Sequence, residues 1–345
     1  MQTQALSTRY HQLKSERPQL RVREAAQALG VSEAELVAAD GAQRLRPDWA
    51  ALLEQLPTLG RVMCLTRNEA CVHERHGRYE KVEINGGMGL VLGPDIDLRL
   101  FLRRWACGFA CIQTLHSGVR QSLQFFDAAG TAIQKIYLTA DSDAGAYETL
   151  LSRFIELAPA PFIAQPEPAK PAAKPDHEID AAALKRDWEG LRDTHDFFGL
   201  LNKYKVARTQ ALRLAGAPLA VQMSPAISAK MLETVAAQAE PIMAFVGNPG
   251  CIQIHTGAVK TIAVKHGWLN ILDEEFNLHL REDAVAETWL VRKPTEDGVV
   301  TALELFDRDG ELIVQFFGKR KPGIPESPRW RELLARLAVE HAAHA

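Results

Sequence analysis

The chain has 345 residues, of which 47% are hydrophobic, 24% charged and 7% aromatic, the composition of an ordinary globular protein with room for two domains. Its 40 Lys plus Arg residues nearly balance 43 Asp plus Glu residues, and with a formal charge of -3 we do not expect nucleic acid as a partner. The sequence shows neither a secretory leader nor about 18 consecutive uncharged apolar residues, which predicts a cytoplasmic protein that is not embedded in a membrane. Cys residues number five, which predicts reduced, mostly buried thiols rather than a disulfide framework.

Helical and β-rich segments follow one another in the same order in both halves of the chain. Helical periodicity predicts helices over residues 22–29, 47–55, 146–157, 181–192, 196–203, 229–239 and 329–341. Short β-rich runs, bounded by Gly and Asp-x-x-Gly turns, predict antiparallel strands over residues 71–76, 121–126, 132–138, 251–255, 301–306 and 312–317. Helices that bracket an antiparallel sheet in each half make an α+β fold.

A proline-rich stretch and an internal repeat divide the chain. Six prolines within residues 158–178 exclude helix and ladder pairing, which predicts an extended linker between an N-terminal repeat, 1–157, and a C-terminal repeat, 179–345. A shift of 180 residues aligns 61–137 with 241–317 without a gap and gives sixteen identical pairs in 77 positions. This is about three times the number expected by chance. The sequence therefore predicts a tandem duplication.

Residues 25–37, AAQALGVSEAELV, have the pattern of the first two helices of a helix-turn-helix with Gly30 at the turn. A DNA reader needs basic, base-reaching side chains on the second helix, which instead carries Glu33 and Glu35. We therefore expect a structural helix pair, and a transcriptional regulator is the alternative that this pattern leaves open.

The histidine at position 195 stands apart from the other histidines. His73 and His76 lie three apart on a predicted strand, where side chains alternate between faces, so the pair does not predict a metal site. His195 lies in DTHDFF at a predicted helix start. We expect Phe197 and Phe198 to desolvate its ring partly and to keep it neutral, the form that ligates iron. A capping or packing histidine is the alternative interpretation.

Four segments, together with the duplicated halves, carry a resemblance to a known family. They read RVREAAQALGVSEAELVAADG, IDLRLFLRRW, DTHDFFGLLNKYKVARTQALRLAG and FNLHLRED. These segments resemble the HemS-type cytoplasmic haem-utilisation proteins, also called hemin-degrading factors, over residues 8–340. The resemblance implies two similar halves, each with a large curved antiparallel sheet flanked by helices, and one haem held between an iron-ligating His and a distal Arg.

The resemblance also implies which residues of this chain hold haem. His195 matches the iron ligand, and Arg99 matches the distal Arg, which would also take part in any reaction at the iron. The remaining pocket positions implied are Arg208, Phe245, Lys293 and Gln315. Aromatic walls and cations at a rim suit an apolar macrocycle that carries two carboxylates.

The duplication itself bears on how many haems bind. A second shift, of 175 residues, places 30–32 over 205–207 and aligns His195 with Leu20. The shift of 180 aligns Arg99 with His279. Neither member of the ligand pair is therefore repeated at the equivalent position of the other half. We expect one strong haem site per chain, with His279 a structural histidine.

Two functions follow from the resemblance and differ in class. In the first, the protein is an enzyme that cleaves the haem ring oxidatively, with an external electron donor or peroxide, and releases iron. In the second, it carries intact haem to a separate haem oxygenase, after receiving it from an inner-membrane haem importer. The His195 and Arg99 pair serves either role; we favour degradation, and haem binding is common to both.

Overall fold

The computed structural model of the protein describes residues 2–115, 118–167, 169, 172–321 and 323–341. The chain forms two compact units, and each takes a short segment from the opposite half of the sequence. The first unit comprises Met1–Arg67, Glu74–Ala169 and Gly247–Gln253, and the second comprises Asn68–His73, Lys170–Val246 and Ile254–Ala345. Strands β3 (Cys71–Arg78) and β12 (Cys251–Gly257) therefore each pass from one unit to the other.

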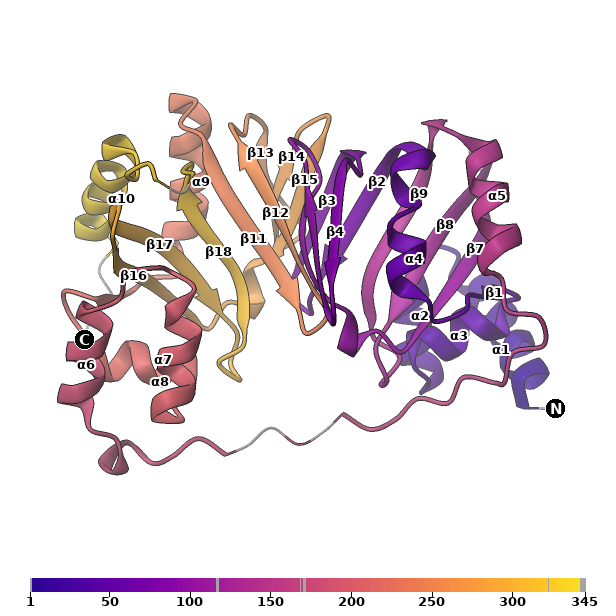
Figure 1. The fold of residues 1–345 in the computed structure, drawn as a ribbon, viewed down its shortest axis with the longest axis horizontal. Coiled ribbons are helices and arrows are strands. Elements are labelled where there is room, and N and C mark those ends of the chain that lie inside the picture. Colours follow the sequence, from indigo (N-terminus) through magenta and orange to yellow (C-terminus); the bar gives the residue numbers. More distant parts are fainter. Residues whose placement is uncertain (1, 116–117, 168, 170–171, 322, 342–345) are drawn as a thin grey trace. The chain divides into compact units, whose positions relative to one another are not determined.

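The first unit is built on an antiparallel sheet between two sets of helices (Figure 1). Its neighbouring strands run in the order β1 (Gln43–Arg44), β7 (Cys107–Leu115), β8 (Gly118–Phe126), β9 (Ala132–Ser142) and β2 (Gly60–Arg67). A further meander consists of β4 (Lys81–Asn85), β5 (Met88–Leu92) and β6 (Asp97–Phe101). The helices are α1 (Gln2–Glu16), α2 (Val22–Leu29), α3 (Glu33–Ala39), α4 (Trp49–Leu53) and α5 (Ala144–Phe154).

The second unit repeats this plan. Its sheet has the order β10 (Ala220–Met223), β16 (Glu287–Thr295), β17 (Gly298–Phe306), β18 (Leu312–Gly318) and β11 (Ile242–Asn248). Its meander consists of β13 (Ile262–Lys265), β14 (Trp268–Leu272) and β15 (Phe276–Arg281). The helices are α6 (Ala181–Glu189), α7 (Asp196–Tyr204), α8 (Arg208–Ala215), α9 (Ile227–Gln238) and α10 (Pro328–Glu340).

Alternation along the strands of the second unit gives its sheet two different faces. Leu290, Leu303 and Phe316 point to one face and pack against α9 and α10. Trp289 and Val291 point to the other and pack against α6, α7 and α8, which Figure 1 shows grouped together. The helices that carry residue 195 and its neighbours therefore cover one face of this sheet.

The segments that each unit takes from the opposite half, Gly247–Gln253 and Asn68–His73, form hydrogen bonds through their backbone groups. We call them the exchanged segments. In the first unit, Gly250 accepts from the Phe101 amide and from the Trp105 indole, both at 3.0 Å. In the second, Ala70 accepts from the Arg281 amide at 2.8 Å. Each exchanged segment therefore contributes main-chain hydrogen bonds to a unit that is otherwise formed by the other half.

The α+β class and the duplication predicted from sequence are confirmed, since both units have the same strand order and helix placement. The looser shift of 175 is also seen in the backbone, because Gly30 ends α2 at φ 69° and Lys205 ends α7 at φ 54°, both in the left-handed region. Sequence periodicity did not predict α1, and it did not delimit α8. Within the expected linker the described residues contain a single-turn 3-10 helix, Asp176–Glu178; Pro168 and residues 170–171 lie outside the described chain.

Candidate functional site

His195 precedes α7 and presents an open imidazole. The His195 side chain is 90% exposed, and its Nδ1 lies 2.5 Å from Oδ1 of Asp193. The His195 backbone amide donates to the same oxygen at 2.8 Å, and this bond contributes most to lowering the pKa of Asp193. A carboxylate on Nδ1 fixes the tautomer in which Nε2 carries the free lone pair, the arrangement that orients metal-ligating histidines.

The environment of this ring differs from the one expected. Phe197 is buried, with 1% exposure, whereas Phe198 is 71% exposed. On a helix with 3.6 residues per turn, residue 197 lies nearly opposite residue 195, while residue 198 lies near it. Partial desolvation of His195 by both phenylalanines was therefore a wrong expectation, because only Phe198 shares its side of the helix and that ring is itself exposed.

A buried carboxylate lies at the centre of a charged cluster in the same unit. Glu304, on β17, is fully buried and accepts from Arg208 Nε at 2.7 Å and from Arg208 Nη2 at 2.6 Å. It also accepts from Lys293 Nζ at 3.1 Å and from Gln315 Nε2 at 2.8 Å. Three of the residues that the resemblance implies for a pocket are thus joined through one side chain.

The ionisation of this cluster follows from burial and mutual charge. Burial opposes ionisation of Glu304, but the charges of Arg208 and Lys293 outweigh it and hold its pKa at about 2. Burial lowers the pKa of Lys293 to about 8, against the opposing attraction of Glu304. With Arg208 charged throughout, the cluster carries a net positive charge below this pKa.

Phe197 connects this cluster to the helix that follows His195. Its ring centroid lies 4.5 Å from Lys293 Nζ and 5.0 Å from Arg208 Cζ, distances typical of cation–π contacts. Trp188 packs edge-on against the same ring with 4.5 Å between centroids. The start of α7 is therefore fixed against the charged cluster.

The cluster continues into an aromatic strip along the sheet face. Glu304 pairs with Gln315 across β17 and β18, and Gln315 pairs with Phe245 across β18 and β11, so the three side chains share a face. The Phe245 and Phe317 rings contact each other with 5.0 Å between centroids, and both residues are half-buried. This strip offers flat apolar surface next to hydrogen-bonding groups.

The six expected site residues are divided between the two units. Five of them belong to the second unit: His195, Arg208, Phe245, Lys293 and Gln315. Lys293 is 4% exposed, so it lies in the interior and not at a rim as expected, because it reaches inward to Glu304. Arg99 belongs to the first unit, on β6, where it donates to the Asp97 carboxylate and to Leu98 O at 3.2 Å. The role of Arg99 opposite His195 stays a prediction.

Glu304 is the residue that sequence reasoning missed. The signal was present in the repeat, because a shift of 180 aligns Glu304 with Gln124 and Lys293 with Gln113. Two charged residues in one half thus replace two carboxamides in the other. His279 forms a 2.7 Å hydrogen bond with Asn270 on the neighbouring strand, as a structural histidine does. Among the described residues, no group of three or more His, Cys, Asp and Glu is arranged to hold a metal ion.

Comparison with known proteins identifies the family. The model of the haemin-degrading HemS.ChuX domain matches residues 30–154 and 205–337, one match in each half. The chain belongs to this family. The two HemS.ChuX matches also fall one on each side of the linker, as the duplication requires.

Relatives in the HemS.ChuX family are similar along almost the whole chain. The hemin transport protein HmuS of Yersinia pestis is 42% identical over 96% of this chain and 97% of its own length, and the hemin transport protein HemS of Yersinia enterocolitica is 41% identical over 97% and 98%. The crystal structure of holo-PhuS, a heme-binding protein from Pseudomonas aeruginosa, is 51% identical with a TM-score of 0.94 over 96% of this chain and 97% of that one. ChuS, described as an Escherichia coli heme oxygenase, is 39% identical with a TM-score of 0.88 over 96% and 99%. No helix in the described part of this chain is both long and apolar enough to cross a membrane.

Proposed function

We propose that this protein binds one haem as its cargo or substrate, with the iron on Nε2 of His195. The observation that carries the proposal is an exposed imidazole, oriented by Asp193, at the start of a helix whose Phe197 packs on the charged cluster around Glu304. A haem site of the kind expected here has a His nitrogen for the iron, an apolar surface for the ring and cations near the two carboxylates. His195, the Phe245 and Phe317 rings and Arg208 of the second unit are residues of these types.

Each residue has a separate part in this proposal. Arg208, which is 22% exposed, is the cation of the cluster most open to a haem carboxylate, and Gln315 adds an amide donor. Phe245 supplies ring contact. Arg99 cannot lose its proton at physiological pH, so in the expected distal position it would hold water or an oxygen ligand by charge-assisted hydrogen bonds.

For the fate of the haem, we propose oxidative degradation with iron release in the cytoplasm, using dioxygen or peroxide and an external electron donor. This rests on similarity to the protein described as a heme oxygenase and on the polar distal Arg99 expected from the resemblance. A carrier that passes intact haem to a separate haem oxygenase is the second candidate. The exposure of His195 and Phe198 favours it, because a ligand so open to solvent is accessible to a second protein. In either case we propose an inner-membrane importer as the source of haem.

A single experiment separates these fates. The haem-loaded protein is exposed to air with ascorbate or a cytochrome reductase system, with and without catalase, while the Soret band and the products are followed. Degradation predicts a defined tetrapyrrole and stoichiometric iron release that survive catalase. Decay that catalase abolishes, together with transfer of intact haem to an apo haem oxygenase, would overturn degradation in favour of the carrier.

A further inference from the structure

The helix that follows His195 carries a glycine in its interior. Gly199 is exposed and lies in the middle of α7. Glycine is the poorest helix former after proline, because it loses the most backbone entropy on folding. Among the helices of the described chain, only α5 also contains a glycine, and Gly145 lies in its first turn. Gly199 therefore weakens α7 at a position where most residues would strengthen it.

Packing within the described chain does not account for Gly199. A Cβ atom at this position would meet no other atom within 4 Å, and its φ does not lie in the left-handed region. Every other glycine of the chain has a positive φ, an atom within 4 Å of such a Cβ, or both. Gly199 is thus the one glycine that neither its backbone conformation nor a close neighbour in the described chain requires.

Gly199 lies on the same side of α7 as the imidazole of His195. His195 has helical backbone angles, φ -70° and ψ -26°, so helical spacing applies from residue 195 onwards. Positions 195 and 199 are one turn apart and differ by about 40° around the helix axis. Side chains on a helix lean towards its N-terminus, so a side chain at 199 would cover the turn that carries His195. Phe198, which is 71% exposed, flanks the imidazole on the other side.

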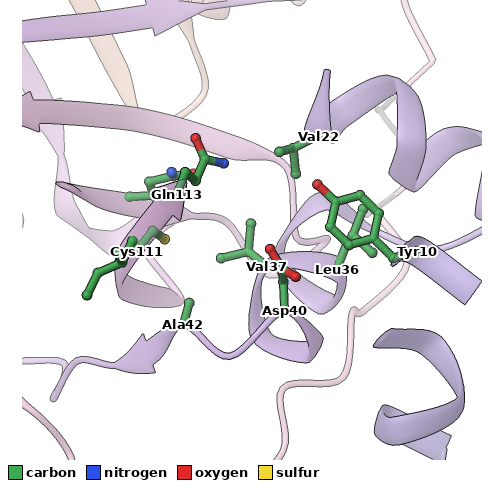
Figure 2. Close-up of a pocket in the computed structure, with 10 residues that line it drawn as sticks. Tyr10, Val22, Leu36, Val37, Asp40, Ala42, Cys111 and Gln113 are labelled. Atoms are coloured by element: carbon green, nitrogen blue, oxygen red, sulfur yellow. The ribbon is translucent and has the colours of Figure 1, made fainter. Parts of the chain in front are cut away.

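The first unit shows what a side chain does at this position. The shift of 175 aligns α7 with α2 and Gly199 with Glu24. Glu24 Oε2 accepts from the Arg21 amide at 2.9 Å, so this side chain reaches back to the residue that precedes α2. Val22 of the same helix lines a small pocket with Tyr10 (Figure 2). The equivalent helix therefore carries a side chain where α7, beside His195, is bare.

We propose that Gly199 is a specificity-determining residue of the haem site, because it leaves room for the edge of a broad planar ring against α7. This inference rests on the proposed function, since it takes His195 as the iron ligand. A macrocycle bound through Nε2 extends beyond the imidazole in every direction of its plane and needs low surface around the ligand. A ligand of only a few atoms needs no such clearance. Phe198 gives the ring an aromatic contact on the opposite side of His195.

The test measures the stability of the haem-free protein and its haem affinity in Gly199→Ala and Gly199→Leu. Both replacements form helix better than Gly, so we expect the Tm of the haem-free protein to rise by about 2 °C. Haem affinity is expected to change in the opposite direction, falling about twofold in Gly199→Ala and at least about tenfold in Gly199→Leu, because the added side chain occupies the space of the ring. The Soret band of the haem that still binds keeps its wild-type position, because the iron ligand is unchanged.

The matched control is Ala237→Leu, which adds the same bulk at an exposed position of α9, a helix on the other face of the sheet. It should leave haem affinity within about twofold of the wild type. An equal loss of affinity in Ala237→Leu and Gly199→Leu would overturn the proposal, since the effect would then not depend on the position beside His195.

His195→Ala, measured in parallel, separates this inference from the proposed function. Weaker haem binding in His195→Ala with unchanged affinity in both Gly199 variants would overturn the role of Gly199 and leave the ligand assignment standing. Unchanged affinity in His195→Ala would overturn the proposed function itself. A lower Tm in both Gly199 variants would show that the glycine serves the fold and would also overturn the inference. If Gly199→Leu does not fold, Gly199→Ala decides: a raised Tm with lowered affinity supports the role, and an undiminished affinity refutes it.

Discussion

Replacing Glu304 by Gln is the perturbation whose outcome follows most directly from the structure. The carboxylate is fully buried and accepts four hydrogen bonds from Arg208, Lys293 and Gln315. Its pKa of about 2 lies below the ordinary 4.5, so the stabilisation that it supplies is present above pH 4.5 and is lost as the pH falls towards 2. A difference of that size corresponds to about 3 kcal/mol.

Lys293 acts in the opposite direction. Its pKa of about 8 lies below the ordinary 10.5, so charging it in the fold lowers stability at neutral pH, and stability is regained as the pH rises from 8 to 10.5. This cost is of the same order, about 3 kcal/mol, and the attraction between Glu304 and Lys293 enters both figures, so they do not add. Buried ion pairs in general add little net stability, because desolvation of the charges offsets their attraction, and here the pair holds charge at a defined place.

Glu304→Gln removes the carboxylate whose ionisation stabilises the fold and leaves Lys293 without its counter-charge. We expect a loss of about 3 to 5 kcal/mol in the free energy of unfolding, measured by urea denaturation at pH 7 with tryptophan fluorescence. Lys293→Gln is expected to lose little stability or to gain some, because it removes a charge that burial disfavours while Arg208 still neutralises the carboxylate.

The double variant Lys293→Gln with Glu304→Gln is the matched control. It gives these two positions the residue types of Gln113 and Gln124 in the first unit, while Arg208 stays where the shift of 175 places Glu33. It should lose less stability than Glu304→Gln alone, because no buried Lys remains without a partner. A loss below about 1 kcal/mol in Glu304→Gln, or a double variant equal to the sum of the single losses, would refute this reasoning.

Three further outcomes are expected. Asp193→Asn should weaken haem binding at least about tenfold in a spectroscopic titration, because the imidazole loses the carboxylate on Nδ1; unchanged affinity would contradict that role. Arg99→Ala should leave haem affinity largely intact but alter the visible spectrum and any turnover, and an unchanged spectrum and rate would remove the distal assignment. Burial raises the pKa of Glu326 from 4.5 to about 7, so its ionisation lowers stability as the pH rises through this range. Glu326→Gln should therefore gain about 2 kcal/mol over the wild type at pH 8 and nothing at pH 4, as urea denaturation at the two values will show.

Repetition made much of the fold predictable from one sequence. The turn residues and the β-rich runs recur after 180 residues, so a strand that one half predicts only weakly is supported by the equivalent run in the other half. Strands β8 and β17 were both predicted in this way. Helix α1 was missed because its sequence, QTQALSTRYHQLKSE, is polar on most sides. Its Tyr10 and Leu13 pack in one cluster with residues of α2 and α3, and such tertiary packing is invisible to periodicity.

Residue type alone did not reveal which site residues are buried and which are exposed. The sequence placed His195 at a helix start, but the exposure of its ring depends on the side of the helix from which residue 195 projects. Lys293 looked like a surface cation because Lys is usually exposed, and it is buried here because Glu304 lies across the hairpin. That partnership joins residues eleven positions apart on two strands, and a single sequence does not show which charges meet.

The central claim is that one haem binds through His195, and an equilibrium haem titration of three proteins tests it most directly. The wild type, His195→Ala and His279→Ala are titrated under anaerobic conditions while the Soret band is recorded. The account predicts one haem per chain in the wild type and in His279→Ala, with weakened binding and a shifted Soret band in His195→Ala. Two haems of equal affinity, or an unchanged affinity and spectrum in His195→Ala, would contradict it.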